Sequence, residues 1–433
     1  MNRLARRIPQ PFMRSPVPVS GEYQAEFATL AQAFRQIQPQ PQRGGSALVV
    51  YFQDQCVLDL WSGWRTPELP WQADTLAMSF STGKAVLSTL VHRLVDLGHL
   101  DYDRPLAQDW PEFAVNGKHD ITLRHVLTHS SGLYDVRSVL PSAATMLRWD
   151  ESVAAYAAAT PRFAAGQDHA YQALSYGWLL GGLIERVMGE PLADVLNREL
   201  VQPLGLEGDV YFGVAESELL RVARAFPPLQ PPSKPMSTLQ TAPTAQSVTP
   251  HASPRPLSLS EKIQQQVTGQ NPYDFDDAMK PKGVGRFNWY GDRQLQACIP
   301  AANGVFTARA LAKMYAMLAN RGEWQGQRYL SEATFQKLST VQTTQRDRIM
   351  PIPMHWRLGY HRVLTLGKRV PYGFGHVGYN GSGAWCDPHR QLSFAYVHSY
   401  AGHSISGDHR IWWLTQRTLQ AADKLLTGRA GWL

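Results

Sequence analysis

The stretch "SFSTGKAVLSTLVHRLVDLGHLDYDRP", residues 79–105, predicts a helix that opens with a serine and a lysine three residues apart, Ser81 and Lys84. The helix has two interpretations: either Ser81 caps it and Lys84 is solvated, or Ser81 is a nucleophile and Lys84 is its base. Gly98 ends the pattern of apolar side chains, which recur at helical spacing at Leu87, Leu90, Val91, Leu94, Val95 and Leu97.

The physical chemistry of a helix N-terminus makes the second interpretation feasible. Free backbone N–H groups and the positive end of the helix dipole lie beside a serine in that position. Positions i and i+3 share a helix face, so the amine of Lys84 can reach the hydroxyl of Ser81. A serine is a weak nucleophile until a base takes its proton, and a lysine can act as that base only when burial or a neighbouring cation keeps it neutral. Only Lys84 among the ten lysines has a serine three residues before it, yet the spacing alone leaves both interpretations open.

The composition is that of an ordinary globular protein. The 433 residues are 44% hydrophobic and 18% charged, and they suffice for one large or two medium domains. The net charge of +7 comes from scattered residues, mostly arginines, so it does not predict a nucleic-acid or membrane surface. Cys56, Cys298 and Cys386 lie too far apart for metal-ligand spacing, and their odd number argues against a disulfide framework.

The N-terminal residues do not predict export. The segment "MNRLARRIPQPFMRSPVPVSGEY" is basic, but prolines and arginines interrupt it before the apolar core of a signal peptide could form. No run of about 18 apolar residues predicts a membrane span. We therefore expect a cytoplasmic protein that binds neither membranes nor nucleic acid.

Predicted strands near both ends of the chain bracket a helical middle. We expect a helix from Ser20, a β-hairpin over residues 46–64 and two strands over residues 382–400. Further helices are expected over residues 307–324 and 408–428. This order favours an α+β fold, in which an antiparallel sheet from both chain ends is flanked by helices and carries an inserted, mainly helical region.

The predicted organisation has four segments. Residues 1–21 are an N-terminal extension, residues 22–110 with 285–430 form the sheet region, and residues 111–225 form the helical region. Residues 226–284 are a Pro-rich insertion. Its first part, up to Pro256, holds nine prolines and almost no large apolar residues, so it cannot bury enough surface to fold alone. We expect either a linker or a rim over the active site.

Two further motifs follow the serine and lysine in chain order. "AYQALSYGWLLGGLIERVMGEPL" places Tyr171 before an apolar helix, and "GFGHVGYNGSGAWCDPHRQLSFAYV" places His376, Val377 and Gly378 before the last strands. The three motifs together resemble the serine β-lactamase and penicillin-binding-protein superfamily. The chain is most similar to the class C β-lactamase-related carboxylesterases, the family VIII esterases, over roughly residues 22–425, and this resemblance implies an α+β fold of the β-lactamase/transpeptidase type. The supporting stretches are "ITLRHVLTHSSGL", "PAANGVFTARALAKMYAMLANRGEW" and "GFGHVGYNGSG".

The resemblance implies a role for each of these residues. Ser81 would be the nucleophile, Lys84 its proton acceptor, and Tyr171 the residue that relays the proton to the leaving group. The triplet His376-Val377-Gly378 matches the K-T-G motif beside the substrate, and the backbone N–H groups of Ser81 and Tyr379 would form the oxyanion hole. The resemblance implies a small-molecule ester as substrate and no metal or organic cofactor. The oligomeric state does not follow from the sequence.

The sequence departs from the superfamily pattern in two places. The tyrosine motif is usually Y-x-N, but Gln172 and Ala173 follow Tyr171, so the asparagine that holds the lysine and a substrate amide is missing. Neither K-T-G nor S-D-N occurs, and His376 stands where a permanent cation would attract a carboxylate. A histidine with an ordinary pKa is mostly neutral at pH 7. We therefore predict hydrolysis of neutral carboxylic esters with short acyl chains.

Several alternatives stay open. A β-lactamase or D-amino-acid peptidase would use the same residues on an amide, an acyltransferase would pass the acyl group to an alcohol or amine, and a non-catalytic relative would keep only the fold. "THSSG" (128–132) is expected to be a structural turn, and "YDFDD" (273–277) a solvated segment without the spacing of a calcium loop. No G-x-S-x-G predicts an α/β-hydrolase elbow. His403 and His409 could line the pocket or a sheet end.

Overall fold

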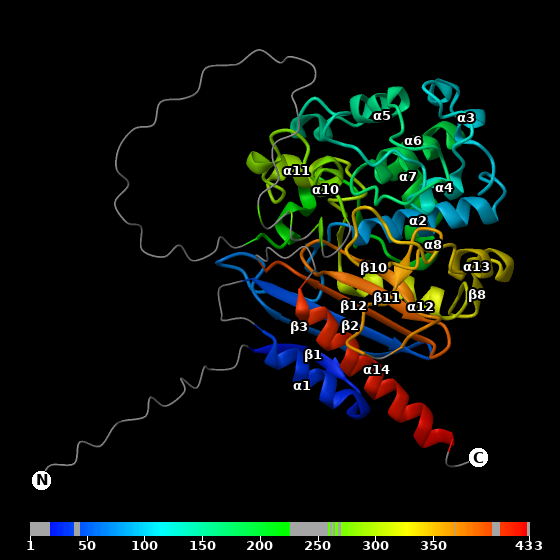
Figure 1. Cartoon of the computed structure of the whole chain (residues 1–433). Coiled ribbons are helices and arrows are strands. Elements are labelled where there is room, and N and C mark those ends of the chain that lie inside the picture. The colour runs from blue at the N-terminus through cyan, green and yellow to red at the C-terminus, as the bar shows by residue number, and fades with distance from the viewer. Residues whose placement is uncertain are drawn as a thin grey trace, which may run out of the picture.

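The protein is described here from a computed structural model. The described residues are 18–38, 44–225, 270–367, 369–400 and 408–430, with four positions between 259 and 266. The Pro-rich segment 226–256 and His403 lie outside them, so the expectations for both stay predictions. In Figure 1 a twisted sheet has helices on both faces, and a larger helical part covers one of these faces.

The main sheet joins strands from both ends of the chain. Its seven strands run in the order β1-β3-β2-β12-β11-β10-β9, and every neighbouring pair is antiparallel. Strands β2 and β12 pair in the middle, from Phe52 opposite Leu392 to Ser46 opposite His398. The predicted fold class is confirmed. The bounds are β1 Val19–Tyr23, β2 Gly45–Phe52, β3 Gln55–Gly63, β9 His361–Arg362, β10 Phe374–Val377, β11 Gly383–Asp387 and β12 Leu392–His398.

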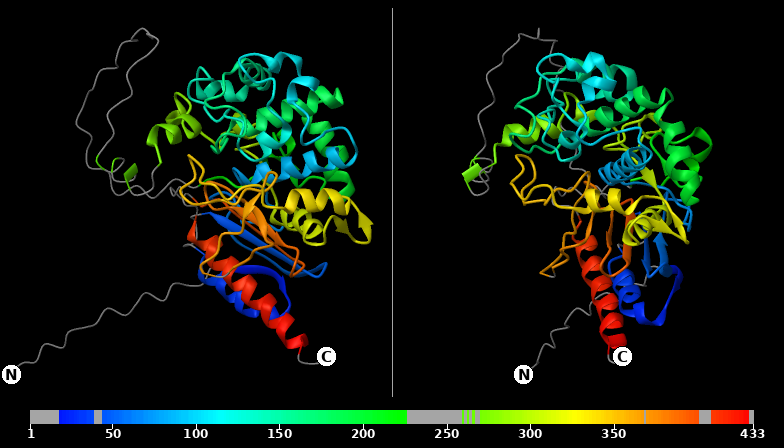
Figure 2. Two further views of the ribbon diagram at one scale, coloured as in Figure 1. Left: turned by 45° about the vertical axis from the view of Figure 1, so that its right-hand side comes forward. Right: turned by 90° about the vertical axis from the view of Figure 1, so that its right-hand side faces the viewer.

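Alternation along the strands separates two cores on the two faces of the sheet. Leu48 and Val50 belong to the core that α1 and α14 cover, whereas Ala47 and Val49 belong to the larger core on the other face. In Figures 1 and 2 the blue α1 and the red α14 lie together below the sheet, while α12 and α2 lie above it. The bounds of these helices are α1 Ala28–Gln36, α2 Thr82–Asp96, α12 Ala308–Ala319 and α14 His409–Ala430.

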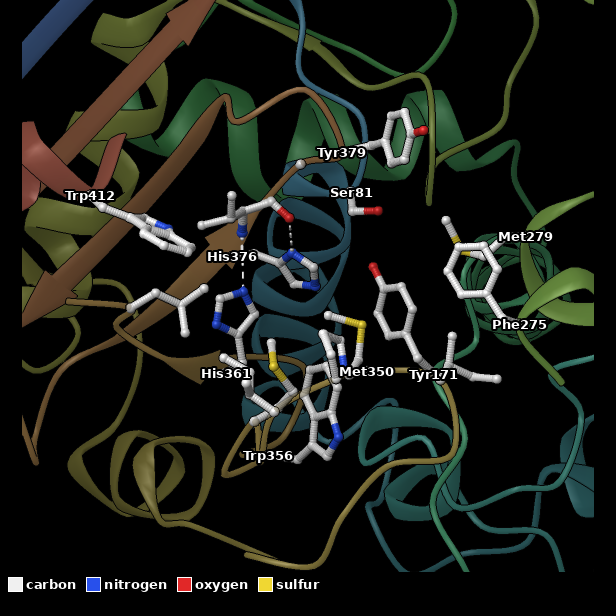
Figure 3. Close-up of a pocket in the computed structure, with 17 residues that line it drawn as sticks. Ser81, Tyr171, Phe275, Met279, Met350, Trp356, His361, His376, Tyr379 and Trp412 are labelled. Carbon is white, nitrogen blue, oxygen red and sulfur yellow. Dashed lines mark hydrogen bonds between the residues drawn. The ribbon is translucent and has the colours of Figure 1, made fainter. Parts of the chain in front are cut away.

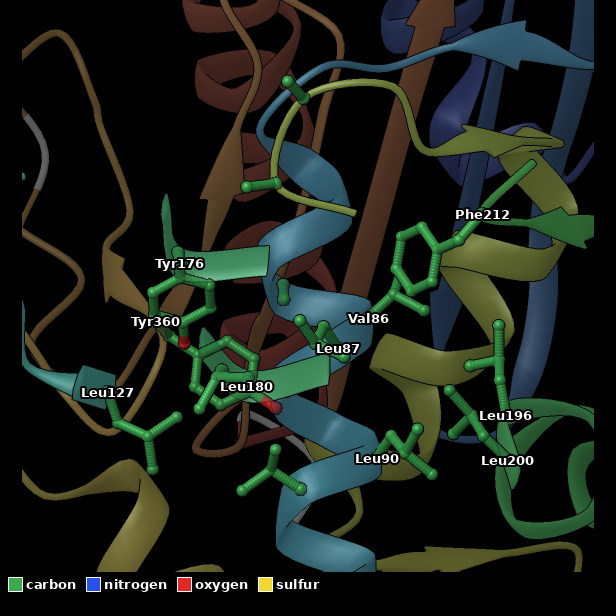
Figure 4. Close-up of a cluster of buried hydrophobic side chains, with 14 of the residues drawn as sticks. Val86, Leu87, Leu90, Leu127, Tyr176, Leu180, Leu196, Leu200, Phe212 and Tyr360 are labelled. Atoms are coloured by element: carbon green, nitrogen blue, oxygen red, sulfur yellow. The ribbon is translucent and has the colours of Figure 1, made fainter. Parts of the chain in front are cut away.

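Helix α2 runs through the larger core and is buried on almost every side. Its side chains from Thr82 to His92 are all buried. Figure 4 shows Leu87 and Leu90 of this helix among side chains that include Tyr176 and Leu180 of α6. The polar side chains of α2 can be buried because they find hydrogen-bond partners inside the protein, as Ser88 does with the hydroxyl of Tyr176 at 2.6 Å. The burial therefore extends to the first turn of α2 and to Lys84.

The helical region covers the sheet face that α2 and α12 occupy (Figure 2). Its long helices pack on α2 or on one another, with α6 contacting both α2 and α5. The elements are α3 Leu106–Asp109, η2 Pro111–Ala114, α4 Leu123–Leu127, η3 Ala143–Leu147, α5 Trp149–Ala158, α6 Ser175–Met188, α7 Leu192–Leu196, the π-helical turn Asn197–Val201, α8 Gln202–Leu204 and η5 Glu216–Arg221.

A second, three-stranded sheet ties the beginning of α2 to the beginning of α12. Its order is β4-β6-β5, and β4 ends three residues before Ser81. The segments before both helices are thereby held side by side. The remaining bounds are β4 Ala77–Met78, β5 Val210–Tyr211, β6 Val305–Phe306, β7 Glu323–Trp324, β8 Gln327–Arg328, α10 Pro272–Met279, η6 Val284–Arg286, α11 Asp292–Gln296 and α13 Glu332–Ser339.

The predicted helix from Ser20 is wrong. Residues Val19–Tyr23 form β1, which pairs with β3, and a 3-10 turn, η1 (Ala25–Phe27), then leads into α1. Pairing along the open edge of β3 satisfies backbone groups that a short helix interrupted by Gly21 would hold poorly. The helical period is real only from Phe27 onward, where Leu30 and Phe34 are buried against the sheet.

Two shorter predictions also need correction or comment. "YDFDD" is only partly solvated, because its five residues are half-buried in α10, where Asp274 accepts a hydrogen bond from Tyr134 at 2.7 Å. His409 is exposed at the beginning of α14 and does not reach a pocket. The segment "THSSG" was predicted to be a turn, and its first two residues, Thr128 and His129, lie in a turn. Within the described residues no helix is long and apolar enough to cross a membrane.

Candidate active site

Ser81 lies at the N-cap position of α2, but it does not cap the helix. Its backbone is helical, with φ −66° and ψ −7°, and its side chain makes no capping hydrogen bond. Instead the hydroxyl oxygen lies 3.2 Å from the amine of Lys84. The interpretation of Ser81 as a capping serine is therefore wrong.

The residue before Ser81 holds a strained backbone. Phe80 has φ +46°, a left-handed conformation that is uncommon for a bulky side chain and marks functional sites when the surroundings enforce it. Its ring packs against Trp289, Tyr290 and Tyr379, with ring centroids 5.8, 6.4 and 5.9 Å away. This aromatic packing offsets the strain and turns the chain sharply, so that Ser81 faces the cleft described below.

Lys84 is fully buried, so the interpretation of a solvated lysine is also wrong. Its amine donates to the backbone carbonyl of Ala173 at 2.7 Å and to that of Ala301 at 2.8 Å, while Ser81 occupies its third side. Burial lowers the pKa of Lys84 well below its ordinary value. With two protons directed at carbonyls, a neutral amine would point its lone pair at the Ser81 hydroxyl.

Tyr171 is held in a stack of buried rings. Its ring lies parallel to Trp356, with centroids 5.8 Å apart, and edge-on to His129 at 4.9 Å. The amine of Lys84 lies over the same ring, 4.8 Å from its centroid. Burial raises the pKa of the Tyr171 phenol, and a hydrogen bond with Ser81 offsets part of that rise. The phenol is therefore protonated at rest and lies beside both Ser81 and Lys84.

The residues after Tyr171 explain how the site manages without the asparagine of Y-x-N. The backbone carbonyl of Ala173 accepts from Lys84, so main chain replaces the missing amide as the partner of the lysine. The side-chain amide of Gln172 points elsewhere and accepts from Ser131 at 3.1 Å. Lys84 therefore keeps a hydrogen-bond partner at residue 173. The replacement of asparagine by Ala173 removes only a polar side chain that could contact the substrate.

The end of β10 approaches Ser81 closely because Gly378 has no side chain. A Cβ at Gly378 would lie 2.2 Å from the carbonyl oxygen of Ser79, so any other residue would push the strand away. The backbone N–H groups of Ser81 and Tyr379 make no hydrogen bond to any described residue. Two free backbone donors, one on Ser81 itself and one next to Gly378, are the kind of groups from which an oxyanion hole is built.

Figure 3 shows the cleft onto which these residues open, with the hydroxyls of Ser81 and Tyr171 facing each other. Phe275 and Met279 lie at one end and Trp412 at the other. The cavity measures about 160 Å³, and none of the described residues that line it is charged. The lining is Ser81, Tyr171, Phe275, Met279, Ile349, Met350, Pro351, Ile352, Met354, Trp356, His361, Leu364, His376, Val377, Gly378, Tyr379 and Trp412.

The residues to which the sequence analysis assigned a role are thus brought together, whereas His409 lies apart from them. Ser81, Lys84 and Tyr171 are in mutual contact, and the triplet at the end of β10 borders the same cleft. Tyr379 supplies its backbone at the rim, where its side chain is 38% exposed. Their chemical roles are taken up below.

Sequence reasoning missed several residues that build the walls. Asp347 is buried and accepts from the backbone N–H of Tyr171 at 3.1 Å and from the Trp356 indole at 3.2 Å, so it fixes both rings of the stack. His361 and Trp412 also line the cleft. A signal was present, because "RIMPIPMHWRLGYH" (348–361) is too rich in methionine and aromatic residues for an ordinary surface loop.

Comparison with known proteins identifies the family. A sequence profile of the family described as "Beta-lactamase" matches residues 30–414. "Esterase/beta-lactamase LipL" of Mycobacterium tuberculosis (strain ATCC 25618 / H37Rv) is 35% identical over 389 residues, which cover 88% of this chain and 83% of that protein. The chain therefore belongs to the beta-lactamase family.

Solved structures with a similar fold include esterases and penicillin-binding-protein homologs. A family VIII carboxylesterase is 26% identical, with a TM-score of 0.77 over 94% of this chain and 100% of that one. A penicillin-binding-protein homolog from Caulobacter crescentus is 28% identical, with a TM-score of 0.75 over 93% of this chain and 100% of that one. The predicted resemblance to the serine β-lactamase-like esterases is confirmed. The chain has the fold of a β-lactamase-type hydrolase, and its relatives support serine hydrolase activity.

Proposed function

We propose that the protein hydrolyses neutral carboxylic esters through an acyl-enzyme on Ser81. The observation that carries the proposal is the environment of Lys84, whose burial and two carbonyl partners leave only Ser81 for its lone pair. A neutral lysine in hydrogen-bond contact with a serine is an activated nucleophile.

In the acylation step the amine of Lys84 takes the hydroxyl proton of Ser81 as the serine oxygen bonds to the ester carbonyl carbon. The carbonyl electrons move to its oxygen, and the free N–H groups of Ser81 and Tyr379 stabilise this oxyanion. When the carbonyl re-forms, the bond to the alcohol breaks. The Tyr171 hydroxyl gives its proton to the leaving oxygen and regains one from the Lys84 ammonium.

Deacylation uses the same groups in reverse. A water molecule takes the place of the alcohol beside Tyr171 and passes a proton through the phenol to Lys84 as it attacks the acyl carbon. When the second oxyanion collapses, the bond between the acyl carbon and the serine oxygen breaks, and the Lys84 ammonium returns a proton to that oxygen. The carboxylic acid leaves, and both Ser81 and Lys84 are restored.

The lining of the cleft favours uncharged substrates with a small apolar part. No described residue in the lining could pair with a substrate carboxylate, and the pKa of His376 is lowered by burial, so this ring is neutral at pH 7. An apolar cavity of roughly 150 Å³ accommodates a group of about the size of benzene. The cavity of about 160 Å³ therefore suits a short acyl chain.

A substrate panel tests the proposal. We expect p-nitrophenyl acetate and butyrate to be hydrolysed far faster than nitrocefin or penicillin G at pH 7. Efficient hydrolysis of either β-lactam would favour the amide-directed alternative, and ester products formed with an added alcohol would favour acyl transfer. A fluorophosphonate probe should label the peptide that contains Ser81. Labelling of Ser130, Ser131 or Ser382 in its place would contradict the assignment.

A further inference from the structure

The edge of β10 next to the cleft is only partly covered by its neighbour. Strand β9 is two residues long and pairs with Phe374 and Gly375 alone, so Val377 lies beyond its end. Two histidine side chains satisfy the groups that this strand leaves open. The backbone N–H of Val377 donates to Nε2 of His361 at 3.1 Å, and the backbone carbonyl of Val377 lies 3.2 Å from Nδ1 of His376 (Figure 3).

These contacts fix the tautomer of His361. Its Nε2 accepts a hydrogen bond from the Val377 N–H, so the ring proton must sit on Nδ1, which donates to the Arg362 carbonyl at 2.7 Å. Burial lowers the pKa of His361 to about 4, so the ring stays neutral at physiological pH. His361 is thus a rigid support for the end of β10.

The tautomer of His376 follows from its own partner. A carbonyl oxygen can only accept, so Nδ1 of His376 carries the proton and donates it to Val377. The neutral ring then has a bare lone pair on Nε2. This nitrogen is buried and has no hydrogen-bond partner among the described residues, although the His376 side chain lines the cleft beside Ser81. His376 as a whole is only 2% exposed.

A buried acceptor without a donor costs roughly 1–3 kcal/mol and calls for a physical reason. Among the buried side-chain nitrogen and oxygen atoms of the described lining, no other acceptor is unpaired, and the lining carries no charge. A substrate that brings a hydroxyl or amide N–H to this point would satisfy the nitrogen. An ammonium group would find no carboxylate in the described lining to stabilise it.

We propose that Nε2 of His376 accepts a hydrogen bond from the substrate, so that the preferred ester carries a neutral hydroxyl or amide N–H close to its ester group. This inference rests on the proposed ester hydrolysis at Ser81. A site built to hydrogen-bond a hydroxyl discriminates strongly against an analogue that lacks it, because the buried acceptor is left unpaired. His376 therefore sets specificity, where a lysine in the same place would select an anion.

Two pairs of esters of matched shape test the proposal. The acyl pair is p-nitrophenyl 3-hydroxybutyrate against p-nitrophenyl 3-methylbutyrate, and the alcohol pair is 2-hydroxyethyl butyrate against propyl butyrate. In each pair a hydroxyl replaces a methyl group. We expect kcat/KM to favour the hydroxyl member of at least one pair by about tenfold, the value of one well-placed hydrogen bond.

Three variants assign that preference to one nitrogen. His376→Phe should bring the ratio within the favoured pair close to one, and His376→Gln, which keeps an acceptor, should restore part of it. The matched control is His398→Phe, because His398 is also buried with an unpaired Nε2 but does not line the cleft. The control should keep the full ratio. Circular dichroism verifies that each variant is folded.

Binding separates this proposal from the proposed function. The same esters are titrated by calorimetry into Ser81→Ala protein, with and without His376→Phe, so that the affinity ratio is measured without any turnover. If no ester is hydrolysed but the hydroxyl preference in binding depends on His376, the ester hydrolysis fails and this inference stands. If esters are hydrolysed yet neither pair favours the hydroxyl, or the preference survives His376→Phe, the inference is overturned.

Discussion

Lys84 and Lys118 are both fully buried, and in each the amine lies against two backbone carbonyls. Lys118 donates to Val115 and Ala159, which ties the loop after η2 to the end of α5. Burial lowers the pKa of Lys118 to about 8, and it lowers the pKa of Lys84 well below its ordinary value. The decisive difference is the third position around the nitrogen.

Around Lys118 that third position holds no hydroxyl among the described residues, and the amine lies over the ring of Phe113, 5.2 Å from its centroid. Around Lys84 it holds the hydroxyl of Ser81. Burial and carbonyl partners thus make a lysine a structural link, and in the proposed mechanism the same surroundings make it a base only where a hydroxyl completes them. The following experiments test this distinction, from the largest expected effect to the smallest.

Removal of the hydroxyl should have the largest effect. Ser81→Ala should reduce ester hydrolysis to the uncatalysed background, because no other group is placed to form the acyl-enzyme. The measurement is the initial rate with p-nitrophenyl butyrate, alongside circular dichroism to verify folding. Turnover by folded Ser81→Ala protein at more than a trace of the original rate would remove Ser81 from the mechanism.

Removal of each lysine should separate the base from the structural link. Lys84→Ala should lower kcat by about 10²–10⁴-fold, the usual contribution of general acid–base catalysis. Lys118→Ala should leave kcat unchanged and lower the free energy of unfolding by about 1–3 kcal/mol, since two buried carbonyls lose their donor. Steady-state kinetics and urea unfolding of both variants give the comparison. Equal kinetic losses would show that burial alone, and not the hydroxyl, matters.

Tyr171 should share its effect with Lys84. Tyr171→Phe should lower kcat strongly by itself, and the double variant with Lys84→Ala should lose little more, because groups that act as one proton relay are not additive. The four enzymes of the cycle are assayed with the same ester. Losses that simply multiply would mean that the two side chains work independently.

The pH dependence of kcat/KM should reflect the titration of Lys84 and should not depend on Lys118. The active form has a neutral Lys84, so kcat/KM should fall by about tenfold per pH unit once the pH drops below its pKa. Since burial lowers that pKa, the plateau should be reached well below pH 10.5. Lys118→Ala should leave the profile unaltered. A rate that keeps rising up to pH 10 would mean that Lys84 is protonated at neutral pH.

A new cation at the end of β10 should have the smallest effect. His376→Lys should raise the rate on penicillin G relative to its methyl ester by about tenfold, because a charged hydrogen bond to the carboxylate is typically worth 1.5–3 kcal/mol. The methyl ester has the same shape without the charge and is the matched control. An unchanged ratio would mean that the substrate carboxylate does not reach residue 376.

The sequence predicted the elements of this site better than it predicted their contacts. The period of α2 follows from local pattern, whereas the grouping of Ser81, Lys84 and Tyr171 could be foreseen only because the three motifs resemble those of a known family. Whether Ser81 caps the helix depends on Ala173 and Ala301, whose carbonyls hold the amine. A backbone carbonyl leaves no trace in the residue type, so no motif could reveal it.

Other features were missed because they are short or because pairing decides them. Strand β9 has only two residues, too few for any periodicity, and His361 therefore had no context. Strand β1 was mistaken for a helix since its pairing with β3 outweighs local preference. Asp347 acts through hydrogen bonds to Tyr171, which lies 176 residues away in the sequence, and to Trp356, which lies nine residues further along the chain. Neither partner can be inferred from the residues next to Asp347.

The pairing of β2 with β12 also bears on how the chain is made. Phe52 and Leu392 face each other, so the inner edge of β2 stays bare until some 340 further residues have been added. At a synthesis rate of about 5–20 residues per second, this takes roughly 17–70 s. A long apolar strand with an open edge is prone to pair with other chains during that time.

The active site shares this delay. Thr82, next to the nucleophile, bonds through its hydroxyl to the carbonyl of Ser382, 300 residues later, at 3.0 Å. A ribosome that stalls before β10 would therefore release a chain that contains Ser81, Lys84 and Tyr171 but lacks the strand that completes the cleft. We expect such a truncated chain to be inactive and to be bound by chaperones or degraded by proteases.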